Sequence, residues 1–135
     1  MASIRKEIDI AAPAAEVWDV VRDLGAIHTR FVRGFVIDTK LEEGSRIVTF
    51  ETGLVVQELF VDLDDEARRF AYAVRSETMT HHNASMQVFP EGPQSCRLVW
   101  VTDLLPDEAA GPIGAMIERG STIIRATLDR QTAAD

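Results

Sequence analysis

Three residues of this chain have side chains that could share acid–base chemistry: Glu58, Tyr72 and His82. A carboxylate or a neutral imidazole can take up a proton, and a phenol can donate a hydrogen bond to a carbonyl oxygen. Together they could remove a proton next to a carbonyl group and protonate a departing hydroxyl group. This chemistry requires that the three side chains face one enclosed space.

The alternation of side chains along β-strands predicts that they share a face. Successive residues of a strand point to opposite sides of a sheet, so residues of one parity lie together. If the large apolar residues point inward, so do the three polar residues above. The predicted inward set is Val56, Glu58, Phe60, Phe70, Tyr72, Val74, His82, Ala84, Met86, Val88, Leu98, Trp100, Thr102 and Leu104.

The polar members of this set each have two interpretations. Glu58 is either an acid–base group or the partner of Arg46 on a neighbouring strand, since a buried carboxylate needs compensation. The Tyr72 hydroxyl either satisfies a buried carboxylate or orients a ligand carbonyl. His82 either transfers protons near neutral pH or meets solvent at the entrance of its strand.

The histidines do not predict a metal site. His81 and His82 are adjacent in a strand and point to opposite faces, so they cannot chelate one ion. His28 follows the first predicted helix, near the expected mouth of the enclosed space, but no HxxxH, CxxC or facial-triad spacing occurs. We therefore expect His28 to contact a ligand, and we expect no metal or other cofactor.

One strand, two short helical segments, further strands and a long helix are predicted to position these residues. Residues 4–10 alternate like a half-buried strand, the segment 13–25 has apolar residues at helical spacing, and 26–30 forms a second short helix or turn. Turn residues then separate the remaining strands, which predicts consecutive antiparallel hairpins. The predicted strand ranges are 34–41, 46–51, 54–63, 68–74, 83–89 and 96–105.

The closing helix is predicted to begin at Asp107 or Gly111 and to end near Ala133. It carries an apolar stripe, and Gly120 allows close approach to the sheet. A curved sheet held by one terminal helix usually encloses a cavity, so we expect an elongated apolar cavity between them. Its predicted ligand contacts are His28, Phe60, Phe70, Tyr72, Met86, Trp100, Thr102, Met116 and Ile117.

Short motifs spread over the whole chain support this arrangement. They are residues 8–13 with Val17-Trp18, Gly44-Ser45-Arg46, residues 56–60 before Asp64-Asp65, residues 69–72, and residues 98–100 before Leu104-Leu105-Pro106. In these motifs the chain resembles the START/Bet v1-like (SRPBCC) superfamily, specifically its bacterial polyketide cyclase/dehydrase-like branch. The resemblance covers residues 1–135 as a single ligand-binding domain.

The resemblance implies an α+β helix-grip fold. In that fold a seven-stranded curved antiparallel sheet wraps around a long C-terminal helix, short helices follow the first strand, and the ligand lies between sheet and helix. The resemblance favours pairing of Glu58 with Arg46, because relatives often carry both, whereas His82 stands where relatives often have an aromatic residue. It does not fix the chemistry, because the superfamily includes cyclases, hydrolases, lipid carriers and hormone receptors.

The composition narrows the class of protein. A chain of 135 residues with 46% hydrophobic and 27% charged residues is typical of one soluble domain. The net charge of −8 and the scattered arginines argue against nucleic-acid binding. No apolar run approaches the ~20 residues of a membrane span. Since no signal-like segment is recognised either, a cytoplasmic location is expected, and the single cysteine, Cys96, which cannot form an internal disulfide, agrees with it.

Three functions are compatible with this sequence. The first, which we favour, is binding of a hydrophobic small molecule (polyketide-, lipid- or aromatic-like) in the cavity. The second is a cofactor-independent cyclase or dehydrase that uses Glu58, Tyr72 and His82 on a polyketide-like carbonyl substrate. The third is an interaction module whose cavity is vestigial.

The parity of the strands also predicts self-association. An antiparallel sheet normally shows polar residues to water on its outer face, and apolar side chains there need cover. We therefore expect a homodimer through that face, unless a β-bulge shifts one strand and tucks its side chains away. The residues that predict it are Leu59, Val61, Val99 and Val101.

Overall fold

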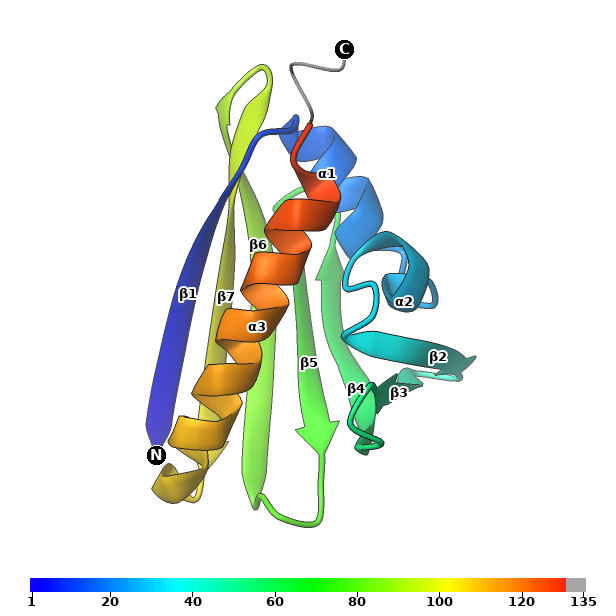
Figure 1. The fold of residues 1–135 in the computed structure, drawn as a ribbon, viewed down its shortest axis with the longest axis vertical. Helices are drawn as coiled ribbons and strands as arrows, with labels where there is room; N and C mark the ends of the chain where they lie inside the picture. Colours follow the sequence, from blue (N-terminus) through cyan, green and yellow to red (C-terminus); the bar gives the residue numbers. More distant parts are fainter. Residues whose placement is uncertain (131–135) are drawn as a thin grey trace.

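The computed structural model describes residues 1–130, in which one antiparallel sheet of seven strands curves around a long C-terminal helix (Figure 1). The strands lie in the order β1-β7-β6-β5-β4-β3-β2. Their bounds are β1 (Ala2–Ile10), β2 (Val36–Glu42), β3 (Ser45–Phe50), β4 (Val55–Asp64), β5 (Arg69–Arg75), β6 (His81–Gly92) and β7 (Ser95–Leu105). The predicted helix-grip fold is confirmed.

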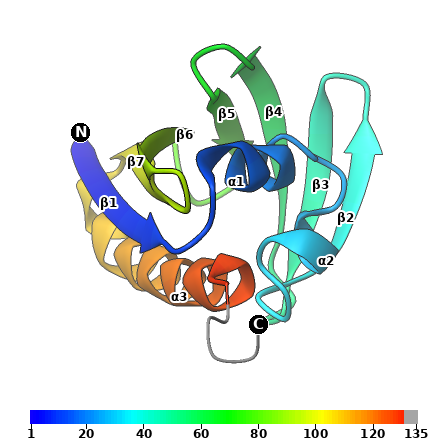
Figure 2. The same cartoon turned by 90° about the horizontal axis from the view of Figure 1, so that it is seen from above.

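Two short helices and the closing helix lie on the concave side of the sheet, as Figure 2 shows from above. They are α1 (Ala14–Val21), α2 (Ile27–Arg30) and α3 (Ala110–Leu128), with one 3-10 turn, η1 (Asp107–Ala109), before α3. Pro13 precedes α1 in an extended conformation, and Glu16 lies in its first turn, where a carboxylate favours the helix dipole. The short helices close one end of the curve, and α3 crosses its open side.

Two boundaries differ from the sequence prediction, one in a strand and one in the closing helix. Strand β6 begins at His81 rather than Asn83, because His81 and His82 pair with Leu105 and Leu104 of β7. His82 is therefore held inside the sheet. Helix α3 ends at Leu128, so the predicted end near Ala133 is wrong; residues 131–135 lie outside the described part of the chain.

The early end of α3 has a local cause. Asp129 is extended, and its carboxylate accepts a hydrogen bond from the Ala11 amide at 2.8 Å. The Arg130 amide donates to the Ala11 carbonyl at 2.9 Å. These bonds fasten the end of α3 to the segment between β1 and α1, so the chain leaves the helix there.

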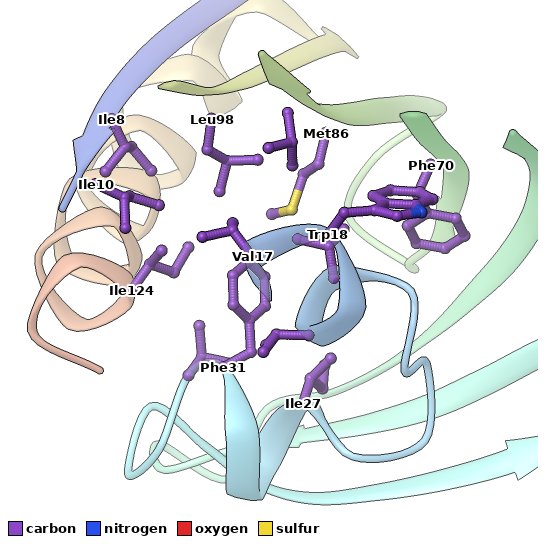
Figure 3. Packing of buried hydrophobic residues seen from close by; sticks show 14 of the residues in the cluster. Ile8, Ile10, Val17, Trp18, Ile27, Phe31, Phe70, Met86, Leu98 and Ile124 are labelled. Atoms are coloured by element: carbon purple, nitrogen blue, oxygen red, sulfur yellow. The ribbon is translucent and has the colours of Figure 1, made fainter. Parts of the chain in front are cut away.

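The core fills the end of the concave face nearest α1 (Figure 3). Val17 and Trp18 of α1 lie among side chains of the sheet and of α3. The Trp18 indole donates to Asp65 at 2.9 Å, and the Arg22 guanidinium donates to the same carboxylate at 2.7 Å. The other residues labelled in this cluster are Ile8, Ile10, Ile27, Phe31, Phe70, Met86, Leu98 and Ile124. This end of the sheet is closed by packing.

The outer face differs from the one that sequence parity suggested. A register shift occurs in β4 between Phe60 and Asp62, so the anticipated bulge is present, but it leaves Val61 60% exposed. Val99 is only 5% exposed within the single chain. The predicted row of four exposed apolar side chains is therefore wrong at Val99.

Candidate functional site

A cavity of about 250 Å³ lies at the opposite end of the concave face, between the sheet and the first half of α3. Strands β3 to β7, the β5–β6 loop and α3 all contribute to its walls. Its lining is mainly apolar with a few polar groups, which is typical of small-molecule sites. The lining residues are Phe35, Phe50, Leu54, Val56, Glu58, Tyr72, Val74, Ser76, Thr78, Met79, His82, Trp100, Thr102, Pro112, Ile113, Met116 and Ile117.

The structure brings together seven of the residues proposed for the site from sequence: Glu58, Tyr72, His82, Trp100, Thr102, Met116 and Ile117. Three others, Phe60, Phe70 and Met86, have the predicted parity but lie nearer α1, outside the cavity lining. His28, on α2, is also outside it. These four residues therefore do not line the cavity. For the three strand residues the reason is that parity fixes the face of a strand and not the position along it.

Sequence reasoning missed several wall residues. Phe50 follows the inward parity of its strand and could have been found; its ring meets that of Phe35 edge-on, with centroids 5.2 Å apart. Phe35 and Met79 lie in connecting segments, where no periodic signal indicates which way a side chain points.

Glu58 and Arg46 form a buried ion pair in the wall of the cavity. The two residues are directly opposite each other on β4 and β3, and they are 7% and 5% exposed. The Arg46 Nε and Nη2 atoms both lie 2.7 Å from Glu58 Oε1. Arg46 also donates to the Leu24 carbonyl at 3.2 Å. The predicted pairing is confirmed, and Glu58 Oε2 receives no hydrogen bond from the described residues.

Tyr72 presents a phenol to the cavity from β5. Its ring is stacked on Phe70 with centroids 5.2 Å apart, and it is only 5% exposed. Burial and, next, the negative charge of Glu58 raise the pKa of the Tyr72 hydroxyl well above its usual value, while Arg46 opposes the rise. The hydroxyl therefore keeps its proton. It forms no hydrogen bond with Glu58 or any other residue in the range 1–130, so it does not serve to satisfy the carboxylate.

Trp100 reaches the same part of the cavity from β7. Ala84 of β6 lies between Tyr72 and Thr102 in register, and Trp100 is two residues before Thr102 on the same face. The indole N–H lies close enough to Tyr72 to oppose the rise in its pKa. It nevertheless lacks hydrogen-bond geometry, so Trp100 Nε1 is buried without a partner among the described residues.

The absence of a side chain at Gly120 allows Trp100 this position. A β-carbon at Gly120 would lie 3.3 Å from the Trp100 ring and 3.4 Å from the Phe35 ring. The contact with Trp100 is tighter than ordinary van der Waals distance, and the contact with Phe35 is at its lower limit. The glycine therefore lets α3 lie directly on the two aromatic rings.

His82 contributes an imidazole from the start of β6. Burial and, next, the neighbouring His81 lower the pKa of His82 below its ordinary value. The ring is therefore neutral at pH 7 and can act as a proton acceptor. Its Nδ1 atom is buried and has no hydrogen-bond partner in the part of the chain that is described. Within residues 1–130 no group of three or more His, Cys, Asp or Glu side chains is placed to hold a metal ion.

The cavity and fold agree with a comparison against known protein families. The family model described as "Polyketide cyclase / dehydrase and lipid transport" matches residues 1–134. The chain belongs to this family. None of the curated proteins matches the sequence significantly. Membership of the family supports ligand binding in general, and it specifies neither a ligand nor a reaction.

Solved structures show the same fold. A protein from Thermobifida fusca is 25% identical and superimposes with a TM-score of 0.71, over 97% of this chain and 99% of that chain. A START superfamily protein from Mycobacterium smegmatis is 15% identical (TM-score 0.76; 93% and 96% covered). Norcoclaurine synthase from Thalictrum flavum, solved with dopamine and hydroxybenzaldehyde, is 21% identical (TM-score 0.66; 96% and 89% covered). The latter two similarities concern the fold alone.

No described helix of the present chain is long and apolar enough to cross a membrane.

Proposed function

We propose that this protein binds a compact hydrophobic small molecule in the cavity between the sheet and α3. The observation that carries the proposal is an apolar cavity into which a few polar groups project, which is the composition expected of a ligand site. The family match supports it.

The size of the cavity limits the ligand. Its volume of about 250 Å³ lies below the range of roughly 300–1,000 Å³ of drug-sized sites and above the roughly 150 Å³ that encloses benzene in an engineered cavity. A molecule of one or two rings, or a short acyl chain, suits this space. A long-chain lipid or a tetracyclic polyketide would require the walls to move apart.

A pair of substitutions on neighbouring strands tests the proposal. Val74→Phe places a ring inside the cavity, and Val61→Phe adds the same ring to an exposed position of β4 as a control. Binding of the two-ring compound 1-indanone is measured by calorimetry, and native mass spectrometry of freshly purified protein identifies any ligand that co-purifies. We expect Val74→Phe to weaken binding at least ~10-fold and Val61→Phe to leave it unchanged. Equal affinity in both variants would place the ligand elsewhere.

A second candidate function is cofactor-independent acid–base catalysis of the cyclase or dehydrase type. A neutral His82, a protonated Tyr72 and the free oxygen of Glu58 all border the cavity. His82 or Glu58 would remove a proton from the carbon next to a carbonyl group, and Tyr72 would donate a hydrogen bond to the oxygen as negative charge develops there.

Deuterium exchange distinguishes catalysis from binding alone. In D₂O, proton removal from 1-indanone and return of a deuteron to the same carbon replaces hydrogen next to the carbonyl, which NMR detects. Catalysis predicts faster exchange with the protein, lost in His82→Gln or Glu58→Gln. Binding without faster exchange assigns the protein to the carriers.

Self-association through the outer sheet face stays a prediction. Of the four predicted residues, Val99 is covered, Val61 is exposed, and Leu59 and Val101 are half-buried. Sedimentation velocity at micromolar concentration of wild type and Val61→Lys decides it. A dimer that Val61→Lys dissociates would support the interface, and a single 15.0 kDa species for both proteins would exclude it.

A further inference from the structure

The Tyr72 hydroxyl is a hydrogen-bond donor whose proton has no acceptor in the protein. It is buried in the cavity wall, and no residue of the described chain accepts its proton. The hydroxyl opens onto the cavity, so a ligand that fills the cavity excludes water from it. An unpaired donor would then cost free energy, which makes the ligand the natural source of its acceptor. Glu58 does not fill this role, because no hydrogen bond joins its carboxylate to Tyr72 and its Oε1 atom is held by Arg46.

Trp100 restricts where that proton can point. An indole N–H only donates, so next to Tyr72 it can approach the lone pairs of the phenol oxygen and never accept its proton. Trp100 Nε1 has no other partner within residues 1–130. Trp100 therefore offers no acceptor on its side of the phenol, which leaves the open part of the cavity for the Tyr72 proton. Trp100 is thus a positioning residue for Tyr72.

The charge of the wall disfavours an anionic ligand. Glu58 borders the cavity, whereas its partner Arg46 does not; Arg46 lies against the Phe70 and Tyr72 rings, 5.2 and 5.7 Å from their centroids. A ligand in the cavity therefore approaches the carboxylate more closely than the guanidinium. A carboxylate or phenolate ligand would meet negative charge in an apolar space. An ammonium group offers no acceptor to Tyr72.

We infer that the ligand carries a neutral carbonyl group, whose oxygen accepts the hydrogen bond of Tyr72 while the rest of the molecule occupies the apolar cavity. This inference rests on the proposed function, and it adds the chemical group that the site selects. It covers a carried ligand and a reacting substrate equally, because both would present the carbonyl oxygen to the same donor.

Four probes of one two-ring skeleton separate the alternatives. Indane has no polar group, 1-indanone has a carbonyl, 1-aminoindane is an ammonium ion at pH 7, and indane-1-carboxylate is an anion. We expect 1-indanone to bind wild-type protein about ten-fold more tightly than indane, as one well-made hydrogen bond allows. The ammonium and carboxylate compounds should bind more weakly than 1-indanone.

Three variants test the assigned roles. Tyr72→Phe removes one oxygen atom and should reduce the 1-indanone to indane preference to about one. Trp100→Phe removes the N–H that orients Tyr72 and should lower the same preference several-fold. Trp18→Phe is the matched control, since its indole donates to Asp65 outside the cavity, and the preference should not change. The ratio of two affinities is insensitive to a general loosening of the fold.

Infrared spectroscopy provides a measurement that needs no variant, because a hydrogen bond lowers the stretching frequency of the carbonyl of bound 1-indanone relative to the free compound in hydrocarbon. Failure of all four probes to bind would overturn both the proposed function and this inference. Equal binding of indane and 1-indanone would overturn the inference and leave the proposed function standing. So would tighter binding of the ammonium or carboxylate probe, a preference that survives Tyr72→Phe, or an unshifted carbonyl band.

Discussion

Removal of Arg46 should expose how strongly the site depends on its ion pair. Arg46→Met keeps most of the aliphatic volume and deletes two 2.7 Å contacts to Glu58 Oε1 and the hydrogen bond to the Leu24 carbonyl. Glu58 would then remain buried and uncompensated. Breaking a buried pair from one side costs about 3–5 kcal/mol.

This loss is large compared with the whole stability of the protein. A domain of 135 residues has a free energy of unfolding of roughly 7–20 kcal/mol at ~0.05–0.15 kcal/mol per residue. Each kcal/mol shifts the melting temperature of such a domain by about 3–5 °C. Arg46→Met should therefore stay folded in most of this range and melt about 10–25 °C lower.

The double variant Arg46→Met/Glu58→Leu separates the cost of a stranded charge from the value of the pair. Replacing both charges by apolar groups removes the uncompensated carboxylate, so most of the lost stability should return. About 1 kcal/mol should stay lost, because the Leu24 carbonyl loses its donor. Urea denaturation of the wild type, both single variants and the double variant gives the four free energies. A loss below about 1 kcal/mol in Arg46→Met, or a double variant no more stable than Arg46→Met, would refute this reasoning.

Three further predictions follow from the structure. Burial lowers the pKa of His82, so its contribution to stability is present above pH ~6.5 and is lost as the pH falls through the folded-state pKa. His82→Gln should therefore flatten the loss of stability on acidification. Urea midpoints between pH 7 and 5 for the two proteins check this, and parallel curves would contradict it. Gly120→Ala should lower both stability and 1-indanone affinity, because the added β-carbon crowds Trp100. Gly111→Ala, with no neighbour near its β-carbon, should leave the affinity unchanged and stabilise α3 by up to ~1 kcal/mol. Equal melting temperatures of the two variants would argue against the crowding. Burial and, next, Glu91 raise the pKa of the Cys96 thiol to about 11. A thiol reagent at pH 8 should therefore react only with unfolded protein. Rapid labelling of the native protein would show instead that the thiol is accessible.

The sequence alone was sufficient for the order of the elements and for which strand residues share a face. A period of two in the strands and an apolar stripe in α3 are local consequences of backbone geometry, so they can be read without the fold. The same parity placed Arg46 and Glu58 on one face of neighbouring strands, and the register makes them direct partners. The seven correctly placed cavity residues follow from this pattern.

Only the tertiary structure decided which part of the concave face remains open. Phe70 and Tyr72 have the same parity and stack on each other, yet only Tyr72 borders the cavity. The difference arises because α1 docks on one end of the sheet and fills it with Trp18 and its neighbours, while Gly120 brings α3 down on Trp100 at the other. Periodicity along a strand carries no information about where a distant helix will pack, so the position of the cavity is a property of the assembled chain.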